Sequence, residues 1–468
     1  MENKKKLPFI TNIFYGMGDF GFSMNNSIIT AFFSIFMVTV VGMAPGYVAI
    51  ILFVGRSWDF VNDLLVGYVS DRTRTKWGRR RPFLLFGAIP FGLSFTLLWL
   101  SPNFGQTGLI IYYSLAYIVY EALATFVYMP YFALTPELTE DYDERTKLTS
   151  FRMMFNIIGS LTAYILPLLI IGPWDSATSR SVMVMAVVAG AIAAAPIFGV
   201  FFGTKEKKEF QKETLPKFWP SLRAAFKNKP FMFGALMYLA TWMAIVVIES
   251  NLQFFILYIV QRQSQNIIIM VAIFVTAIFA LPIWNWVSKN WNKRFAYIIG
   301  VGFWAVVMII LILMTPQTPF WMILIFCVMA GVGVSAGQVL PWAIIPDAIE
   351  WEEWTTGERN EGMFYSLVTL LGKIGMAIAQ PLSLLVLQLT NFQEGQGAIQ
   401  PPSALLGIRL VVGPIPALFL LGGIMIAIFY PLGRTQYNQI VEDLRLRREI
   451  RKAKRAGKKP LPGVSETV

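Results

Sequence analysis

Three charged residues, Arg56, Asp59 and Asp63, lie within an apolar stretch that runs from residue 46 to residue 70. Their spacing of i, i+3 and i+7 places them on one stripe of a helix. Asn62 lies beside the two acids and can add a neutral oxygen. Hard cations such as Na⁺ take oxygen ligands, and a shared proton is the alternative occupant. Since one arginine cannot neutralise two carboxylates, the surplus negative charge predicts a cation site; an ion-paired stripe that only holds helices together is the alternative.

A lysine in another apolar stretch is the expected partner of these acids. Lys373 lies about eleven residues into the stretch 362–389, between Gly372 and Gly375. That depth makes it hard for the ammonium group to reach water by extending along the helix, although such snorkelling is the alternative. We therefore expect Lys373 to pair with Asp59 or Asp63 and to report cation occupancy to the opposite half of the protein.

Four more charged residues interrupt apolar stretches, namely Asp19, Glu121, Arg152 and Glu249. A charge near the centre of a membrane helix costs about 2.5–3.5 kcal/mol on insertion scales, so such residues are paired or line a water-filled path. For Glu121 and Glu249, a packing role as hydrogen-bonded protonated acids is as well supported as a role in function. Among the many aromatic residues, Trp342 follows Pro341 at an expected helix break, and it is the one that we expect to contact a solute.

Composition shows what must position these residues. Of 468 residues, 56% are hydrophobic and 14% are charged, whereas soluble domains carry about 25% charged residues. A membrane helix needs about 20 apolar residues. Stretches of that length fall at 12–41, 46–70, 82–101, 108–134, 150–172, 182–203, 231–260, 267–288, 294–315, 320–347, 362–389 and 407–432. The sequence therefore predicts an all-α membrane protein with twelve transmembrane helices.

The chain divides into two six-helix halves, 1–203 and 231–432, without a clear sequence repeat between them. A basic linker with an expected interfacial helix covers 204–230, and a basic tail covers 433–468. Lysine and arginine concentrate in that linker, in the tail and at 72–81, so both termini are expected in the cytoplasm and the protein in the inner or plasma membrane. The net charge of +12 then faces lipid headgroups, and nucleic acid is not needed as a partner.

The chain contains no histidine and one cysteine, Cys327. Histidine-based nucleophilic triads and histidine metal sites are thereby excluded. Cys327 lies in an apolar run and is expected to be a packing residue. We expect a protein that is not an enzyme and that carries no cofactor besides a coupling ion; a membrane enzyme acting on lipids is the remoter alternative.

Longer motifs resemble the glycoside–pentoside–hexuronide:cation symporters, a branch of the major facilitator superfamily. The segment 51–82, with Gly67-x-x-x-Asp71-Arg72, carries the strongest signature, and 15–20, 129–131 and 355–362 add to it. The resemblance implies a major facilitator fold that works by alternating access. It also implies that Asp59, Asn62, Asp63 and Thr125 bind Na⁺, H⁺ or Li⁺.

The resemblance also bears on the solute. Arg152 and Lys373 match functional positions of the melibiose permease branch, and with Tyr128 and Trp342 they are the candidates near the solute. The sugar-recognising residues differ, because Phe22-Ser23 replaces a Lys-Asp pair and Tyr128 replaces an acid. Asp19 is therefore not the sugar carboxylate of that branch.

Other stretches are similar to the sodium-dependent lysophosphatidylcholine symporters. They are 51–56, 249–251, 281–284, 340–342 and 346–347. We expect a Na⁺-coupled symporter, most simply a monomer, for a sugar or glycoside. A lysophospholipid or similar amphiphile is the alternative solute, and an uncoupled facilitator is a remoter one.

Overall fold

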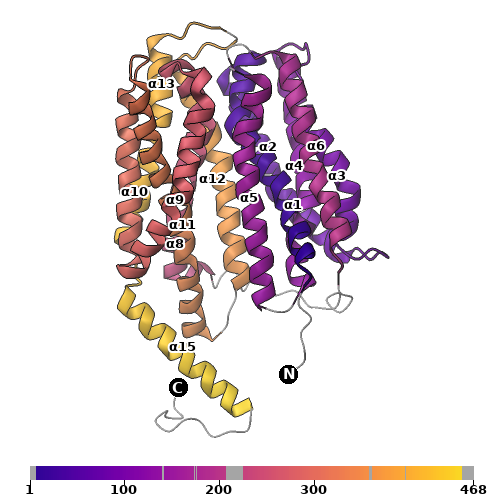
Figure 1. The fold of residues 1–468 in the computed structure, drawn as a ribbon, viewed down its shortest axis with the longest axis vertical. Coiled ribbons are helices and arrows are strands. Elements are labelled where there is room, and N and C mark those ends of the chain that lie inside the picture. The colour runs from indigo at the N-terminus through magenta and orange to yellow at the C-terminus, as the bar shows by residue number, and fades with distance from the viewer. Residues whose placement is uncertain are drawn as a thin grey trace.

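The computed structural model describes residues 7–139, 142–172, 174, 177–206, 225–357, 361–395 and 397–455, and in these the elements are helices joined by loops. The first group of helices is α1 (Phe9–Ile28), α2 (Pro45–Arg72), α3 (Arg81–Leu98), α4 (Gln106–Leu138), α5 (Tyr142–Ile171) and α6 (Ser179–Gly203). The second is α8 (Lys229–Phe254), α9 (Asn266–Asn290), α10 (Lys293–Ile310), α11 (Phe320–Thr356), α12 (Glu361–Leu389), α13 (Pro402–Val412) and α14 (Pro414–Ile428). The helix α15 (Arg434–Arg455) follows. Figure 1 shows the two groups side by side with both termini at one end.

The prediction of an all-helical membrane protein is confirmed. Within the described residues, ten helical segments are long and apolar enough to cross a membrane. The α1 and α2 helices complete the first group; α2 contains Arg56, Asp59 and Asp63, which lower its hydropathy. The α1 helix continues through two π-helical segments, η1 (Ile29–Phe33) and η2 (Phe36–Val40), and α8 continues through η4 (Phe255–Val260).

Three expectations about the spans need correction or fall outside the structure. The helix expected to break near Pro341 is continuous, because α11 accommodates Pro341 and Pro346 and runs to Thr356. The last span is divided at Gly413, where Pro414 starts α14. The interfacial helix expected within 204–230 lies largely outside the described residues.

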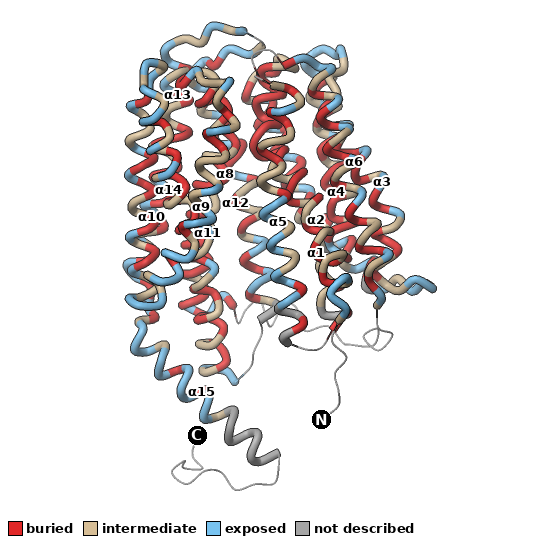
Figure 2. Tube along the Cα trace, in the orientation of Figure 1, coloured by how far each residue is buried: buried red, intermediate tan, exposed pale blue. Residues whose placement is uncertain are grey.

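The two groups of helices meet at the end opposite the termini. There the Gly46 amide donates to Gln388 Oε1 at 2.9 Å, and the Gly395 amide donates to the Val38 carbonyl at 2.9 Å. A buried apolar cluster joins the same ends, with α1 and α2 residues packed among residues of η4, α12 and α13. Figure 2 shows buried residues on the helix faces turned toward neighbouring helices. The protein is therefore sealed at that end.

At the end near the termini, an arginine in each half ties one helix to another; we call this contact the arginine clasp. At the start of α3, the Arg81 Nη2 atom donates to the Phe201 carbonyl near the end of α6 at 2.7 Å. At the start of α10, Arg294 Nη2 donates to the Ile428 carbonyl at the end of α14. In both halves the first turn of the third long helix is thus tied to the last turn of the sixth. This structural repeat aligns the two halves although their sequences show no clear repeat.

Close packing of α2 on α4 fixes the helix that carries the charged stripe. A Cβ atom at Gly55 would overlap the Tyr117 ring of α4. We expect Gly55→Ala to lower the melting temperature by about 1–3 °C, since overpacking costs about 1–3 kcal/mol and a chain of 468 residues loses about 1 °C per kcal/mol. The measurement is the melting temperature of the purified protein. Gly67→Ala on the same helix is the control, because its Cβ would meet Met129 at an ordinary 3.5 Å; equal stability of the two variants would contradict the prediction.

Candidate functional site

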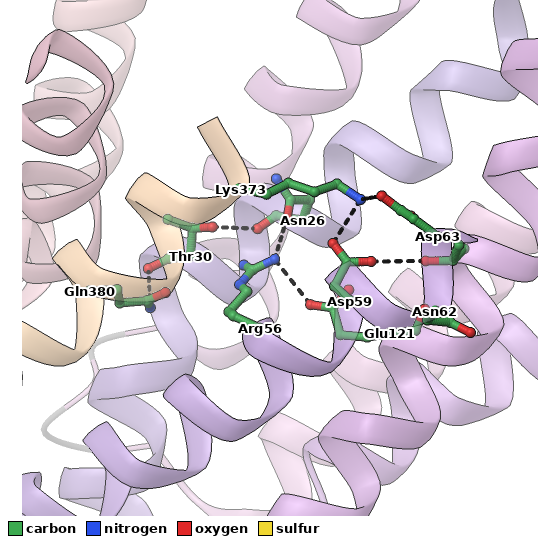
Figure 3. Close-up of polar contacts among 10 residues, drawn as sticks. Asn26, Thr30, Arg56, Asp59, Asn62, Asp63, Glu121, Lys373 and Gln380 are labelled. Carbon is green, nitrogen blue, oxygen red and sulfur yellow. Dashed lines mark hydrogen bonds and ion pairs between the residues drawn. The ribbon is translucent and has the colours of Figure 1, made fainter. Parts of the chain in front are cut away.

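Lys373 joins the two halves at the charged stripe of α2. Its Nζ atom lies 2.8 Å from Asp59 Oδ2 and 2.5 Å from Asp63 Oδ2. Figure 3 shows the lysine reaching from α12 across to the two carboxylates. The expected pairing is therefore present, and it involves both acids at once. The ammonium group occupies the space between the carboxylates where a small cation would otherwise neutralise them.

The α4 helix supplies the other polar neighbours of this pair. Thr125 Oγ1 donates to Asp59 Oδ1 at 2.9 Å. Asn62 Nδ2 donates to the Glu121 and Ala122 carbonyls, each at 3.3 Å. The positions expected to hold a cation therefore lie together, with Asn62 fastening α2 to α4. These oxygens are of the kind that hard cations prefer.

Arg56 turns away from the two aspartates of its own helix. Its Nη1 atom lies 3.0 Å from Glu121 Oε1 and 3.3 Å from Asn26 Oδ1. The carboxylate of Glu121 is thus an ion-pair partner, and it belongs to the same cluster as the aspartates. With all groups ionised, three acids (Asp59, Asp63 and Glu121) face two cations (Arg56 and Lys373), and −3 plus +2 leaves −1. One further positive charge balances this core.

The site is more accessible at Asp63 than at Asp59. The side chains of Asp63 and Lys373 keep 28% and 29% of their area exposed, whereas Asp59 keeps 10%. A cation reaching the pair from solvent therefore meets Asp63 and the lysine first. Among the described residues no group of three or more His, Cys, Asp or Glu side chains has the arrangement of a metal site.

A second ion pair lies within the first half. Arg152 Nε of α5 is 3.3 Å from Asp19 Oδ2 of α1, and the guanidinium group also lies over the Phe132 ring at 5.1 Å. Asp19 is almost wholly buried. The pair accounts for the charge of both residues and leaves Arg152 partly exposed.

Tyr128 is packed among aromatic rings. It is 2% exposed, and its ring centroid lies 4.4 Å from that of Phe22 and 5.4 Å from that of Phe91. Phe22 and Tyr128 occupy two of the three places where charged sugar-recognising residues are expected from the resemblance. The two rings therefore contact each other where the resemblance places charged side chains.

Trp342 lies in an aromatic group on the second half. Its ring packs edge-on against Tyr238 at 5.2 Å and stacks with Tyr365 at 6.3 Å. Tyr238 in turn stacks with Trp242 at 5.7 Å. Since Trp342 and Tyr365 are 37% and 38% exposed, this group presents a flat aromatic face.

Glu249 lines an apolar pocket inside the second half. The cavity volume of the pocket is about 90 Å³, and the pocket is partly open to the outside. Glu249 is the one charged residue among those that line it, and Tyr164 of α5 lies beside it. The rest of the lining is almost entirely apolar and comes mainly from α8, η4, α9, α10 and α11.

The sequence analysis missed several polar residues that extend the cluster. Asn26 of α1, Thr30 of η1 and Gln380 of α12 join it through hydrogen bonds, as Figure 3 shows. A signal was present for Gln380, because it lies seven residues after Lys373 and therefore on the same helix stripe. It carries no charge, and a search for charges in apolar stretches passes over it.

Comparison with known proteins gives consistent matches along the chain. The family model described as MFS/sugar transport protein matches residues 14–434. An uncharacterized symporter of Synechocystis sp. is 32% identical, over 95% of this chain and 98% of that protein. The sodium-dependent lysophosphatidylcholine symporter 1-A of Danio rerio is 28% identical, over 96% of this chain and 91% of that protein.

Solved structures share the fold at low identity. A bacterial homologue of the human lysosomal transporter Spinster, inward-facing and unoccupied, has a TM-score of 0.68 and 13% identity, covering 93% of this chain and 98% of that one. A D-xylose–proton symporter has a TM-score of 0.61 and 14% identity, covering 90% of this chain and 97% of that one. These structures support the fold and leave the solute to the chemistry of the site.

Proposed function

Because the chain belongs to the MFS/sugar transport protein family, we propose that this multi-pass membrane symporter couples Na⁺ to the movement of an amphiphile with a long apolar chain. The family and the relatives are those of transporters rather than enzymes. We place both termini in the cytoplasm, since the basic segments lie on their side of the membrane. The sealed end of the structure then faces outward.

The cation half of the proposal is supported by the Asp59–Lys373–Asp63 contact. The lysine belongs to one half of the protein and the two acids to the other. A Na⁺ ion bound by the acids supplies the charge that the lysine now supplies, and so it competes with the contact between the halves. Binding of the cation therefore alters the free-energy difference between the open and closed arrangements. A proton is the alternative coupling ion, since either carboxylate can hold one.

The part of the proposal that concerns the solute rests on the apolar pocket that contains Glu249. Fully burying an alkyl chain gains about 0.8 kcal/mol per CH₂ group, and the pocket offers such an environment next to one polar group. The Phe22–Tyr128 contact lies where the resemblance places charged sugar-recognising side chains, which favours a solute other than a sugar. The relative named as a lysophosphatidylcholine symporter makes an amphiphile of this class a reasonable first candidate.

A sugar or glycoside is the second candidate. The stacked pair of Trp342 and Tyr365 supports it, because sugar rings pack on exposed aromatic faces. The family description points the same way. An uncoupled facilitator would use the same cavity without the cation.

The first test follows melting temperature and uptake with lysolipids, fatty acids, sugars and glycosides, each in Na⁺ or in choline. A ligand that binds only the folded state stabilises it by about 2.7 kcal/mol at a hundredfold excess over Kd. We expect a lysolipid to stabilise the protein and to be taken up, in both cases more strongly in Na⁺. Sugar-specific stabilisation would replace the proposed solute by the second candidate. A solute response that is the same in Na⁺ and in choline, at every pH, would overturn the coupling.

A pocket-filling variant tests the place of the apolar chain. We expect Ile273→Trp to reduce lysolipid uptake at least tenfold, since the larger side chain fills space along the pocket. Ile278→Trp on the same helix is the control, because Ile278 is 42% exposed on the outer surface. Uptake by each variant is measured in proteoliposomes at matched protein content. Equal activity of the two variants would show that the chain binds elsewhere.

A further inference from the structure

A stripe of neutral polar side chains connects the sealed end of the protein with the charged cluster. On α1 and its π-helical extension the stripe consists of Asn26, Thr30 and Ser34, spaced by four residues and so on one helix face. Four residues of helix rise about 6 Å. The stripe therefore covers about 12 Å of the distance from the charged cluster toward the sealed end.

A matching stripe runs along α12. Lys373 and Gln380 are seven residues apart, and Gln388 follows after eight more, so that all three lie on one face of the helix. Lys373 holds the two aspartates, and Gln388 accepts a hydrogen bond from Gly46 at the sealed end. Gln380 lies between them and donates to Ser34 Oγ at 3.3 Å. The α12 stripe thus spans from the charged cluster to the outer surface.

Hydrogen bonds join the two stripes to the charged cluster. Gln380 Nε2 also approaches the Thr30 carbonyl at 3.5 Å, and Thr30 Oγ1 donates to the Asn26 carbonyl at 2.9 Å. Asn26 Oδ1 accepts from Arg56, the partner of Glu121. Figure 3 shows this sequence of contacts from Gln380 through Thr30, Asn26 and Arg56 to Glu121. We call Asn26, Thr30, Ser34 and Gln380 the polar seam.

The α8 helix adds a second amide beside the seam. Asn251 Nδ2 donates to Ser383 Oγ at 2.8 Å, and Ser383 Oγ donates to the Gln380 carbonyl at 2.7 Å. Asn251 and Gln380 are both 0% exposed. Among the described residues, however, neither Asn251 Oδ1 nor Gln380 Oε1 has a hydrogen-bond donor.

Two unpartnered amide oxygens are costly in a sealed contact. Each buried polar atom without a partner costs about 1–3 kcal/mol, and such an atom in a native protein points to a strained element, a water or an ion. Buried apolar residues of both halves, among them Phe33 and Phe36 of the first and Leu387 of the second, belong to one cluster at this end. The polar seam therefore has a role other than closure.

We propose that the polar seam is the route by which the coupling cation reaches Asp59 and Asp63 from the face opposite the termini. When the halves part at that face, α12 separates from α1, and the seam oxygens of Asn26, Thr30, Ser34 and Gln380 become a lining for a hydrated monovalent cation. Neutral oxygens can coordinate the ion along the way but bind it only weakly. The net charge of −1 on the core beyond draws it on, since Arg56 is already paired with Glu121. The inference rests on the proposed cation coupling.

Removing the Gln380 oxygen separates a route from a binding site. A residue on the route changes the rate of cation entry, whereas the equilibrium affinity is set at the aspartates. We expect Gln380→Met to slow Na⁺-activated uptake from the face opposite the termini at least tenfold. The Na⁺ concentration at half-maximal thermal stabilisation in detergent should stay within twofold of the wild-type value. Uptake at the wild-type rate, or an equal loss of both quantities, would overturn the proposal.

Opposite charges at the same position distinguish a cation route from a seal. We expect Gln380→Glu to speed Na⁺ entry at least threefold relative to Gln380→Met, and Gln380→Lys to slow it further. A seal is damaged by either buried charge, so equal effects of Glu and Lys would reject the route. If the wild-type protein shows no Na⁺ dependence, the proposed function itself is wrong. If the wild-type protein depends on Na⁺ but the seam variants behave like it, only the proposed route is wrong.

Cysteine labelling tests the route without a change of charge. The chain has a single cysteine, so Cys327→Ser provides a cysteine-free background. We expect Ser34→Cys to react from the face opposite the termini at least tenfold faster with a cationic methanethiosulfonate than with an anionic one. Ser94→Cys is the matched control, because Ser94 is equally buried but lies in α3, away from the seam. No reaction at Ser34→Cys, or no preference for the cation, would overturn the proposal.

Discussion

Replacing Asp59 with asparagine abolishes Na⁺-dependent uptake in our expectation. The substitution retains an oxygen for Thr125 but removes a carboxylate that now contacts Lys373 at 2.8 Å. The core then has two acids for two cations, and no surplus charge is left to bind Na⁺. We expect Na⁺ binding to weaken at least a hundredfold, which corresponds to about 2.8 kcal/mol. Na⁺ titration of melting temperature and of uptake would measure this loss.

A second lysine–aspartate pair provides the control for this prediction. Lys293 Nζ lies 2.5 Å from Asp347 Oδ1 near the ends of α10 and α11, within one half of the protein. Asp347→Asn removes a carboxylate from a similar contact and leaves Asp59 and Asp63 unchanged. We expect its Na⁺ dependence to remain that of the wild type. Full Na⁺ activation in Asp59→Asn would place the cation elsewhere, and loss of activation in both variants would indicate a general defect.

The sequence was sufficient to predict the helices and the central pair. Apolar runs of spanning length locate the long helices because a bilayer leaves few alternatives for the backbone. Charges inside those runs are few, so the partners Asp59, Asp63 and Lys373 were predictable from their rarity and depth. Asp19 and Arg152 were found in the same way, although their contact with each other was not.

Other features depend on contacts that no local pattern encodes. Arg56 lies on the stripe of the aspartates yet pairs with Glu121, because the side chain extends toward α4 and α1 rather than along α2. Trp342 was expected at a helix break, but α11 absorbs both prolines within a continuous helix. The pocket beside Glu249 is formed by residues of many elements, so its shape follows from packing.

The arginine clasps show a repeat that is stronger in structure than in sequence. Trp77 and Trp291 each precede a short basic run at the start of a helix, and the clasp arginines follow at Arg81 and Arg294. Both arginines donate to a carbonyl in the last turn of the final long helix of their half. A tryptophan followed by an arginine is too short a pattern to reveal a repeat in the sequence. It is nevertheless enough to give both halves the same contact at the start of a helix.

Replacing Lys373 with methionine is expected to tighten Na⁺ binding and to uncouple it from the solute. Methionine retains much of the length of the lysine side chain but removes the ammonium group that contacts both aspartates. Without that ammonium group the net charge of the core changes from −1 to −2. A cation then no longer competes with the lysine for the two aspartates. We expect the Na⁺ concentration at half-maximal thermal stabilisation to fall at least tenfold, which corresponds to about 1.4 kcal/mol.

In the same variant, Na⁺ binding in one half should no longer change the affinity for the solute in the other half. In the wild type, linkage requires that the solute and the cation raise each other's affinity by the same factor. Lys373 is the charged contact between the cation-site acids and the half that carries the pocket, so in Lys373→Met we expect this factor to approach one. Lys373→Arg retains the charge and should retain both the weaker Na⁺ binding and part of the coupling. If Lys373→Met binds Na⁺ as the wild type does, the lysine does not compete with the cation, and a proton held by Asp59 or Asp63 becomes the better explanation of their pairing.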